Sequence, residues 1–196
     1  MIEIAQVSRL YRRGADEVHA LEDVSLSIPA GRFVALMGPS GSGKSTLLNL
    51  IAGLDRPTAG EVSVAGRKLS EQSEDELAGF RAAHLGFVFQ FFNLIPVLSA
   101  RENVELPLLL TKLGKAERRQ RADTALRIVG LSERADHMPA QLSGGEQQRV
   151  AIARAIVSDP EIVVGDEPTG DLDAKNAEEV LALLRTLKQD FGKTVV

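Results

Sequence analysis

The sequence predicts an α/β fold in which a mostly parallel sheet is interrupted by an α-helical insertion. Short apolar runs that end on glycine or polar residues are typical of buried parallel strands, and two of them lie at 32–38 and 161–166. Between residues 90 and 159 the apolar residues follow helical spacing instead. A glycine-rich segment at 38–46 separates a predicted strand from a predicted helix, which is the strand–loop–helix order of α/β folds.

The predicted strands all lie outside this insertion. "VSLSI" at 24–28 alternates between apolar and polar residues, which predicts a half-buried strand. The continuous apolar run "RFVALMG" at 32–38 predicts a strand buried on both faces. The remaining predicted strands are 60–66, 85–90, 161–166 and the beginning of one at 193–196.

The predicted helices are marked by spacing and by their ends. Residues 44–54 have helical spacing that Gly53 closes. Ser99 and Glu102 have the S-x-x-E spacing of a capping box, which predicts a helix beginning near residue 100. A further helix is predicted within 115–131 and ends at its glycine. The last helix of the insertion has an apolar inner side, formed by Val150, Ile152, Ala153, Ile156 and Val157.

Composition and charge exclude several classes of protein. The 196 residues are 44% hydrophobic and 26% charged, which is ordinary for one globular domain with a core. A net charge of −4 argues against a general nucleic-acid binder, and the arginines at 117–121 are interleaved with acids, as on a solvated helix face. Since the chain has no cysteine, disulfides and thiol chemistry are excluded.

The start of the chain and its most apolar stretch predict a protein that is soluble by itself. Residues 1–13 carry an early acid and lack the apolar run of a signal peptide. The stretch at 104–114 contains proline and lysine and falls short of the ~20 apolar residues that span a bilayer. A role at a membrane would therefore have to come through a partner.

The segment "GPSGSGKST" has the pattern of a phosphate-binding P-loop. Gly38 and Gly43 are its first and last glycines, and Lys44 and Ser45 follow Gly43 directly. This is the spacing G-x-x-x-x-G-K-[ST]. The glycines let backbone N–H groups surround phosphate oxygens, Lys44 reaches the β- and γ-phosphates, and the Ser45 hydroxyl is a Mg²⁺ ligand. The alternative is a structural turn with an exposed lysine. The predicted phosphate-binding residues are Gly38, Pro39, Ser40, Gly41, Ser42, Gly43, Lys44, Ser45 and Thr46.

Two adjacent acids end the predicted strand at 161–166. Asp166 stands at the carboxyl end of a buried strand, where parallel sheets present ligand-binding groups, and it can hold Mg²⁺ through water. Glu167 follows directly and is the candidate general base that activates the water attacking a γ-phosphate. The alternative is an exposed strand end without a ligand.

A second glycine pair begins a helix in "QLSGGEQQRV" at 141–150. Ser143 and Glu146 have the spacing of a capping box, which explains them without a ligand. Gly144 and Gly145 are not explained by capping, because glycine in a first turn costs up to ~1 kcal/mol relative to alanine. A hydroxyl, two glycines and a helix N-terminus suit a second γ-phosphate clamp. One nucleotide cannot easily use both loops of one chain, so this loop is predicted to serve the nucleotide of another chain.

Four motifs occur in the order and spacing of ATP-binding cassette (ABC) nucleotide-binding domains, and the chain resembles that family over essentially its whole length. They are the P-loop at 38–46, Gln90 after a strand, "LSGGEQQR" at 142–149 and "GDEPTGDLD" at 165–173. The resemblance implies a P-loop NTPase core with a mostly parallel sheet, an N-terminal antiparallel β portion and a helical insertion. It implies one domain over 1–196, with a core of about 1–90 and 158–196 and a helical subdomain of about 91–157.

The resemblance also implies roles for single residues. Tyr11 stands where the family stacks an aromatic ring on adenine, although an ordinary surface tyrosine is the alternative. Gln90 matches the glutamine that reaches Mg²⁺ and the attacking water, and its alternative is a polar strand end. Ser143, Gly144, Gly145 and the adjacent Glu146 match the signature loop, which closes on the ATP of the opposite subunit, and Asp171 and Asp173 match the loop that crosses the dimer interface.

Together these roles describe an ATPase that works as a head-to-tail dimer. Lys44, Gln90 and Glu167 are the predicted catalytic residues, and Ser45, Gln90 and Asp166 are the predicted Mg²⁺ ligands. The implied cofactors are ATP and Mg²⁺, and the implied partners are a second copy of the chain and an integral membrane permease subunit, without nucleic acid. The implied location is cytoplasmic, on the cytoplasmic face of the inner or plasma membrane.

The segment at 89–110 resembles the branch that contains lipoprotein-releasing, macrolide-exporting and cell-division ATPases. Its apolar residues are predicted to dock a coupling helix of the membrane subunit, or alternatively to fill the interface between core and helical insertion. They are Phe91, Phe92, Leu94, Ile95 and Leu98.

The chain departs from the family pattern at its C-terminal end. The family places a γ-phosphate-sensing histidine just after the strand that begins at 193–196, and His19, His84 and His137 lie elsewhere in the order. We expect a truncated sequence; as it stands, the chain is expected to bind ATP and hydrolyse it poorly.

The alternatives are a non-catalytic regulatory member, a cell-division ATPase, or a soluble ABC ATPase acting on DNA or ribosomes. That last class inserts long coiled coils or carries two cassettes, and neither is present here. A P-loop GTPase or kinase would need a base-reading motif or a lid, and neither is visible.

Overall fold

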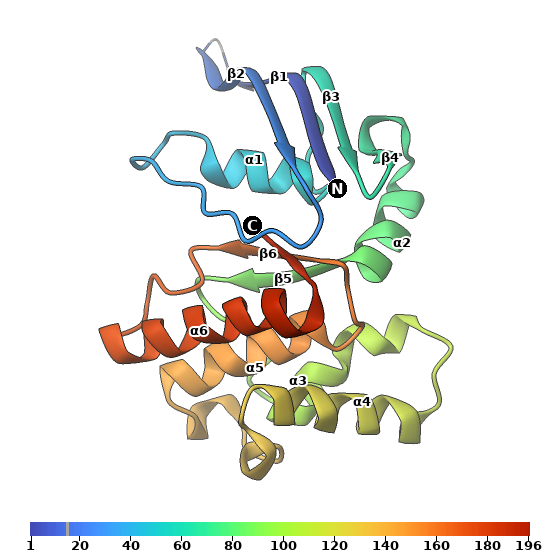
Figure 1. Cartoon of the computed structure of the whole chain (residues 1–196), viewed down its shortest axis with the longest axis vertical. Coiled ribbons are helices and arrows are strands. Elements are labelled where there is room, and N and C mark those ends of the chain that lie inside the picture. Colours follow the sequence, from blue (N-terminus) through green and yellow to red (C-terminus); the bar gives the residue numbers. More distant parts are fainter. Residues whose placement is uncertain (15) are drawn as a thin grey trace.

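The computed structural model describes residues 1–14 and 16–196, which form two sheets and the helices around them (Figure 1). The antiparallel sheet has the order β2-β1-β3-β4 and consists of β1 (Ile2–Arg13), β2 (Asp16–Ile28), β3 (Ala59–Val64) and β4 (Arg67–Lys68). The parallel sheet has the order β5-β6-β7 and consists of β5 (Leu85–Phe89), β6 (Ile162–Asp166) and β7 (Thr194–Val195). The predicted α/β class, with a parallel core and an N-terminal antiparallel portion, is confirmed.

The helices cover both sides of the parallel sheet. They are α1 (Lys44–Ile51), α2 (Glu74–His84), α3 (Ala100–Glu105), α4 (Lys115–Ile128), α5 (Gly144–Ile156) and α6 (Ala174–Phe191), with short 3-10 turns at 69–71, 106–110, 132–134 and 139–141. Figure 1 shows α1 and the antiparallel sheet on one side of the parallel sheet and α3 to α6 on the other. No helix in the described part of the chain is long and apolar enough to cross a membrane.

Strand β6 separates two hydrophobic cores. Successive side chains of a strand point to opposite faces. Val163 accordingly packs in the core formed with the helices, whereas Ile162 and Val164 pack in the core formed with α1 and the antiparallel sheet. The apolar run at 161–166 is therefore buried on both faces, as its composition predicts.

Three α-helices in the described part of the chain begin with a capping box. Ser99 Oγ accepts a hydrogen bond from the Glu102 N–H, and the Glu102 carboxylate accepts one from the Ser99 N–H, so α3 begins where the sequence predicts. Helix α5 begins in the same way with Ser143 and Glu146. A third box, at Ser73, begins α2, a helix that the sequence analysis does not predict.

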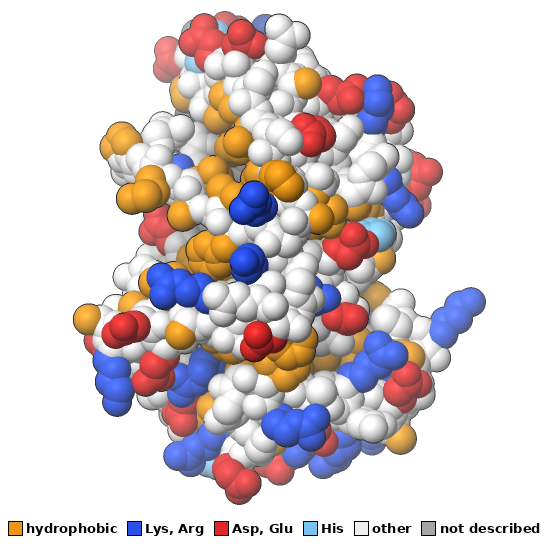
Figure 2. Space-filling view, viewed as in Figure 1, with side chains coloured by type: hydrophobic (Ala, Val, Ile, Leu, Met, Phe, Trp, Pro, Cys, Tyr) orange, Lys and Arg blue, Asp and Glu red, His pale blue; other side chains and the backbone are white. Residues whose placement is uncertain are grey.

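The prediction of a buried strand at 32–38 is wrong. Only Phe33 forms a bridge, parallel to Val195, and the Val34 N–H donates to the Val195 carbonyl at 2.8 Å. Strand β7 has two residues and offers no further partner to residues 35–37. Met37 is consequently 91% exposed. Figure 2 shows hydrophobic side chains exposed on this face near the middle of the molecule, in the region where Figure 1 marks the C-terminus.

Candidate functional site

The glycine-rich loop at 38–46 leads into α1, with Gly43 as the residue that caps the helix. Gly43 has a φ of 87°, and a Cβ placed on it would lie 2.4 Å from the Ala20 carbonyl oxygen. Only glycine therefore suits this position. The left-handed turn directs the backbone N–H groups of the first turn of α1 toward the loop, as in helix termini that bind anions.

Lys44 and Ser45 connect the loop to its surroundings in two ways. The Lys44 ammonium donates to the carbonyls of Gly38 and Pro39, each at 3.0 Å, so it lies against the loop itself. The Ser45 hydroxyl donates to Asp166 Oδ1 at 3.1 Å, although the two residues are 121 positions apart in the chain. The structure thus brings together a hydroxyl and a carboxylate, which are the hard oxygen ligands that Mg²⁺ prefers.

Glu167 follows β6 in an unusual backbone conformation. Its φ of 49° lies in the left-handed region, which few residues other than glycine adopt. Its carbonyl accepts a hydrogen bond from the Gly170 N–H at 3.0 Å, which closes the turn after the strand. The side chain is exposed and adjacent to Asp166, so a water molecule has access to its carboxylate.

Gln90 lies against the loop that follows Glu167. Its Nε2 donates to Asp171 Oδ1 at 3.2 Å, and a Cβ on Gly170 would lie 3.0 Å from the same nitrogen. The absence of a side chain at Gly170 therefore permits this contact. Among the predicted Mg²⁺ ligands, the structure brings Ser45 and Asp166 together and leaves Gln90 on Asp171.

Asp173 begins α6. Its carboxylate accepts hydrogen bonds from the backbone N–H of Asn176 at 2.9 Å and from the Asn176 side chain at 2.6 Å. The backbone hydrogen bond, with the side-chain bond after it, holds the pKa of Asp173 below its ordinary value. Asp173 therefore acts as a helix cap within its own chain.

The signature loop is held by its capping box, and Glu146 is engaged within the chain. The Ser143 N–H donates to the Glu146 carboxylate at 2.8 Å, and this bond is the main reason that the pKa of Glu146 is lowered. Arg134 forms an ion pair with Glu146 at 3.2 Å. The carboxylate is consequently occupied by contacts that stabilise the start of α5.

The two glycines of the loop have different explanations, which corrects the interpretation from sequence. A Cβ on Gly145 would lie 1.9 Å from Asn176 Oδ1 and 3.0 Å from Asn176 Cβ, so packing against α6 requires glycine there without any ligand. Gly144 is exposed, and a Cβ on it would lie 3.8 Å from the nearest atoms, in Leu172 and Phe92. Only Gly144 lacks a structural explanation.

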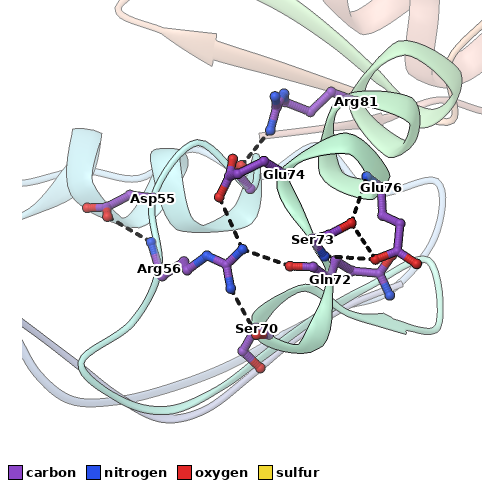
Figure 3. Close-up of polar contacts among 9 residues, drawn as sticks. Asp55, Arg56, Ser70, Gln72, Ser73, Glu74, Glu76 and Arg81 are labelled. Atoms are coloured by element: carbon purple, nitrogen blue, oxygen red, sulfur yellow. Dashed lines mark hydrogen bonds and ion pairs between the residues drawn. The ribbon is translucent and has the colours of Figure 1, made fainter.

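Tyr11 is held by neighbours that the sequence does not reveal. Its hydroxyl donates to Asp55 Oδ2 at 2.6 Å, and the Arg9 guanidinium lies 4.4 Å from its ring centroid. Arg9 also pairs with Asp55 at 2.7 Å. Figure 3 shows how Arg56, next to Asp55, donates to the carbonyl of Gln72 and the carboxylate of Glu74, which fixes this loop against α2. Asp55 lies 44 positions from Tyr11, so no local pattern could have found it.

An apolar cavity of about 190 Å³ adjoins the loop and the end of β6. Lys44, Asp166 and Glu167 stand at its wall, and apolar residues at 33–36 and 195–196 form the rest of it. The charged groups of the site therefore lie beside an apolar wall.

The chain is similar to known proteins over most of its length. Residues 21–170 match the family described as ABC transporter. The chain is 52% identical over 200 residues to the uncharacterized ABC transporter ATP-binding protein MJ0796 of Methanocaldococcus jannaschii, covering all of this chain and 85% of that protein. It is 48% identical to the macrolide export ATP-binding/permease protein MacB of Burkholderia pseudomallei, of which it spans 30%.

Solved structures give the same assignment. A dimeric post-hydrolysis state of the cassette MJ0796, bound to ADP and Pi, has a TM-score of 0.91 and 48% identity, and the match covers 100% of this chain and 86% of that one. A second dimeric structure of MJ0796 has the same TM-score at 50% identity, with the same coverage. The likeness to MacB agrees with the branch expected from 89–110. On these grounds the chain belongs to the ABC transporter family, as one of its ATP-hydrolysing cassettes with ATP and Mg²⁺ as cofactors.

Proposed function

We propose that two copies of this chain close around two Mg-ATP molecules and so drive an integral membrane permease of the macrolide-export or lipoprotein-release type. The observation that carries the proposal is the start of α5, where Gly144 is exposed and a Cβ on it would make only ordinary contacts, at 3.8 Å, so packing does not require glycine there. An open helix N-terminus beside a serine is suited to bind an anion. The relative MJ0796 has dimeric cassette structures, which supports the proposal that this anion is a phosphate bound by a second copy of the chain.

In this proposal the loop at 38–46 holds the phosphates of ATP. Its backbone N–H groups and the Lys44 ammonium surround the β- and γ-phosphates, after Lys44 leaves the carbonyls of Gly38 and Pro39. The Tyr11 ring stacks on adenine through one face, while Arg9 covers the other. Ser45 and Asp166 would hold Mg²⁺, with Gln90 as a further ligand once it leaves Asp171. When bound, the ion offsets the charge on the β- and γ-phosphate oxygens.

Hydrolysis requires a base beside the γ-phosphate. Glu167 accepts the proton of the attacking water, because its exposed carboxylate follows Asp166 directly and meets no cation in the described structure. Gln90 orients that water. General-base catalysis contributes about 10²- to 10⁴-fold to a rate, so Glu167 is a large part of the activity but no part of ATP binding.

The partner chain completes the site. Ser143, Gly144 and Gly145 of one protomer approach the γ-phosphate bound by the other, with Glu146 holding the loop through its capping box. Asp171 lies on the loop between Glu167 and α6, where it joins Gln90 to the dimer interface. Each ATP thus lies between one P-loop and the signature loop of the second protomer.

A groove of about 500 Å³ between the core and the helical subdomain is the proposed docking site for the permease on the cytoplasmic face of the membrane. Leu54 and Phe87 line it from the core, and Leu110 and Arg154 line it from the helical part. Phe91 and Val97, in the segment 89–110, are 72% and 77% exposed. Leu94, in contrast, packs on the helical core, so the predicted segment serves both purposes.

The test of this proposal is dimerisation that depends on ATP. A Glu167→Gln variant should lose hydrolysis by about 10²-fold or more, because the base is removed. With saturating Mg-ATP it should elute from a sizing column as a dimer, and without nucleotide as a monomer. Glu161→Gln is the matched control, since Glu161 lies just before the same strand, β6, and pairs with His84. It should keep full hydrolysis.

Two results would speak against the proposal. A Glu167→Gln variant that binds ATP and stays monomeric would contradict the shared site. Full hydrolysis in Glu167→Gln would contradict the role of the base.

A further inference from the structure

Gln148 is a fully buried glutamine on α5, one turn after the signature loop. Its Nε2 donates to the Phe89 carbonyl at 3.2 Å and to the Pro168 carbonyl at 2.5 Å. Phe89 is the last residue of β5 and precedes Gln90, and Pro168 follows Glu167. One amide group therefore joins the signature helix to the two loops that carry the water-orienting glutamine and the general base.

Core packing does not account for a glutamine at this position. Gln148 Oε1 is buried and has no hydrogen-bond partner among the residues that the structure describes. Turning the amide over would place this oxygen against two carbonyl oxygens, so the orientation is fixed. A buried acceptor without a donor destabilises a fold. Methionine would fill nearly the same volume, but it would leave the Phe89 and Pro168 carbonyls without this donor. The two carbonyl contacts, and not the volume of the side chain, therefore call for an amide here.

Other contacts from α5 act on the same loops. Arg154 donates to the carbonyls of Phe92 and Asn93 at 2.7 Å and 2.5 Å, and both of those residues have positive φ. At the start of α5, Gly145 is in contact with Asn176, just after the loop that carries Asp171. Helix α5 therefore holds the backbone on both sides of Gln90 and one side of Glu167.

We propose that Gln148 is a positioning residue that keeps the signature helix, Gln90 and Glu167 in one fixed arrangement. When the partner's γ-phosphate binds at the start of α5, Gln148 passes the resulting shift to the Phe89 and Pro168 carbonyls and aligns Gln90 and Glu167 for hydrolysis. This inference rests on the proposed function, because it takes the signature loop to bind ATP of the second protomer.

The test replaces the amide by an apolar side chain of similar size. Gln148→Met should lower kcat by between about 10-fold and about 100-fold, the effect of misplacing catalytic groups by ~1 Å, and should leave KM for Mg-ATP within about two-fold. Hydrogen exchange of the backbone at 90–93 and 167–171 should become faster, because both loops lose their anchor.

Asn103→Leu is the matched control. Asn103 is also a fully buried amide, and it donates to the carbonyls of Ile95, Leu98 and Ser99, away from the site. This variant should lower the thermal midpoint at least as much as Gln148→Met. Measured well below both midpoints, its kcat should match the parent chain. Equal loss of kcat in both variants, or a kcat of Gln148→Met within two-fold of the parent, would overturn the proposal.

A second variant serves if Gln148→Met does not fold. Gln148→Glu has the same shape, but an ionised carboxylate repels the two carbonyls, and a protonated one restores one O–H donor. Burial raises the pKa of such a carboxyl, so it becomes protonated as the pH is lowered. The kcat of Gln148→Glu, divided by the kcat of the parent chain, should therefore rise as the pH is lowered from about 8 to about 6. A ratio that does not change with pH would contradict the role of donation.

Failure of this inference and failure of the proposed function give different results. The shared ATP site fails if Glu167→Gln stays monomeric with Mg-ATP. The role of Gln148 fails if exchange at 90–93 and 167–171 is the same in Gln148→Met and the parent, and this can be measured on a monomer without nucleotide.

Discussion

The two glycines that begin α5 are adjacent in sequence and differ in what surrounds them. Gly145 is buried against Asn176, whereas Gly144 is exposed, and a Cβ added to it would make only ordinary contacts, at 3.8 Å, with Leu172 and Phe92. The cost of glycine in a first turn therefore indicates a ligand only for Gly144. A sequence cannot separate the two, because Asn176 is 31 positions further along the chain and reaches Gly145 only through the packing of α6.

Alanine substitutions should separate the two glycines. Gly145→Ala overpacks the contact with Asn176 and should lower the free energy of unfolding by about 1–3 kcal/mol in urea. Gly144→Ala should leave that free energy unchanged or raise it by up to about 1 kcal/mol, because alanine favours helix. In the Glu167→Gln background, Gly144→Ala should nevertheless weaken ATP-dependent dimerisation, since the methyl group intrudes where the phosphate is proposed to bind.

A double variant provides the control for this comparison. Asn176→Ala removes the amide that a Gly145→Ala methyl group would meet, so the pair together should be less unstable than the sum of the single changes. Strict additivity would show that the overpacking at Gly145 has another cause. Gly144→Ala with unchanged dimerisation would remove the argument for a ligand at Gly144.

A helix or strand could be predicted from sequence only where its buried residues follow a regular local spacing. Strand β1 is not among the predicted strands, because register shifts between Ile4 and Val7 and between Val7 and Arg9 break the alternation of buried residues. Helix α2 is not predicted because only Leu77 and Phe80 of its residues are buried. Helix α6 does carry a readable pattern in Val180, Leu184 and Leu187, although it is not among the predicted helices. The capping boxes at Ser99 and Ser143 and the buried run at 161–166, in contrast, depend on short spacing and were predictable.

The capping boxes predict a dependence of stability on pH. Hydrogen bonds from the backbone N–H of the cap serine are the main reason that the pKa values of Glu76, Glu102 and Glu146 are lowered. A carboxyl whose pKa is lower in the folded chain stabilises it above the unfolded pKa of about 4.3, and this contribution is lost as the pH falls through the folded pKa. The free energy of unfolding should therefore decrease as the pH is lowered from about 5 to about 3.

Glu102→Gln isolates one of these contributions. Glutamine still accepts the hydrogen bond of the cap but does not titrate, so part of the acid dependence should disappear while α3 remains folded. Glu105→Gln, at the other end of α3, should leave the dependence as it was. If both variants show the acid dependence of the parent chain, the capping carboxylates are not its source.

As a whole, the chain carries a P-loop at 38–46 and a signature loop at 143–146, which we propose to be two halves of a shared nucleotide site. Four motifs in register predict the ABC transporter family from sequence, and the match over residues 21–170 confirms it. The contacts that join helix α5 to the loops of Gln90 and Glu167 were not predictable. Gln148 reaches Phe89 and Pro168 across 59 and 20 positions of chain. In the proposed dimer, the P-loop of one protomer and the signature loop of the other form one ATP site.

Mixing two defective chains tests this claim most directly. In the Glu167→Gln background, one chain carries Lys44→Ala in its P-loop and the other carries Gly144→Asp, whose charge repels a phosphate. Each variant alone can form only defective sites, whereas a mixed dimer contains one site with both halves intact. Native mass spectrometry with Mg-ATP should therefore show dimers of mixed mass, each holding ATP, only after the two chains are combined. A mixture that stays monomeric while the Glu167→Gln parent dimerises, or single variants that dimerise as well as the parent, would contradict the account.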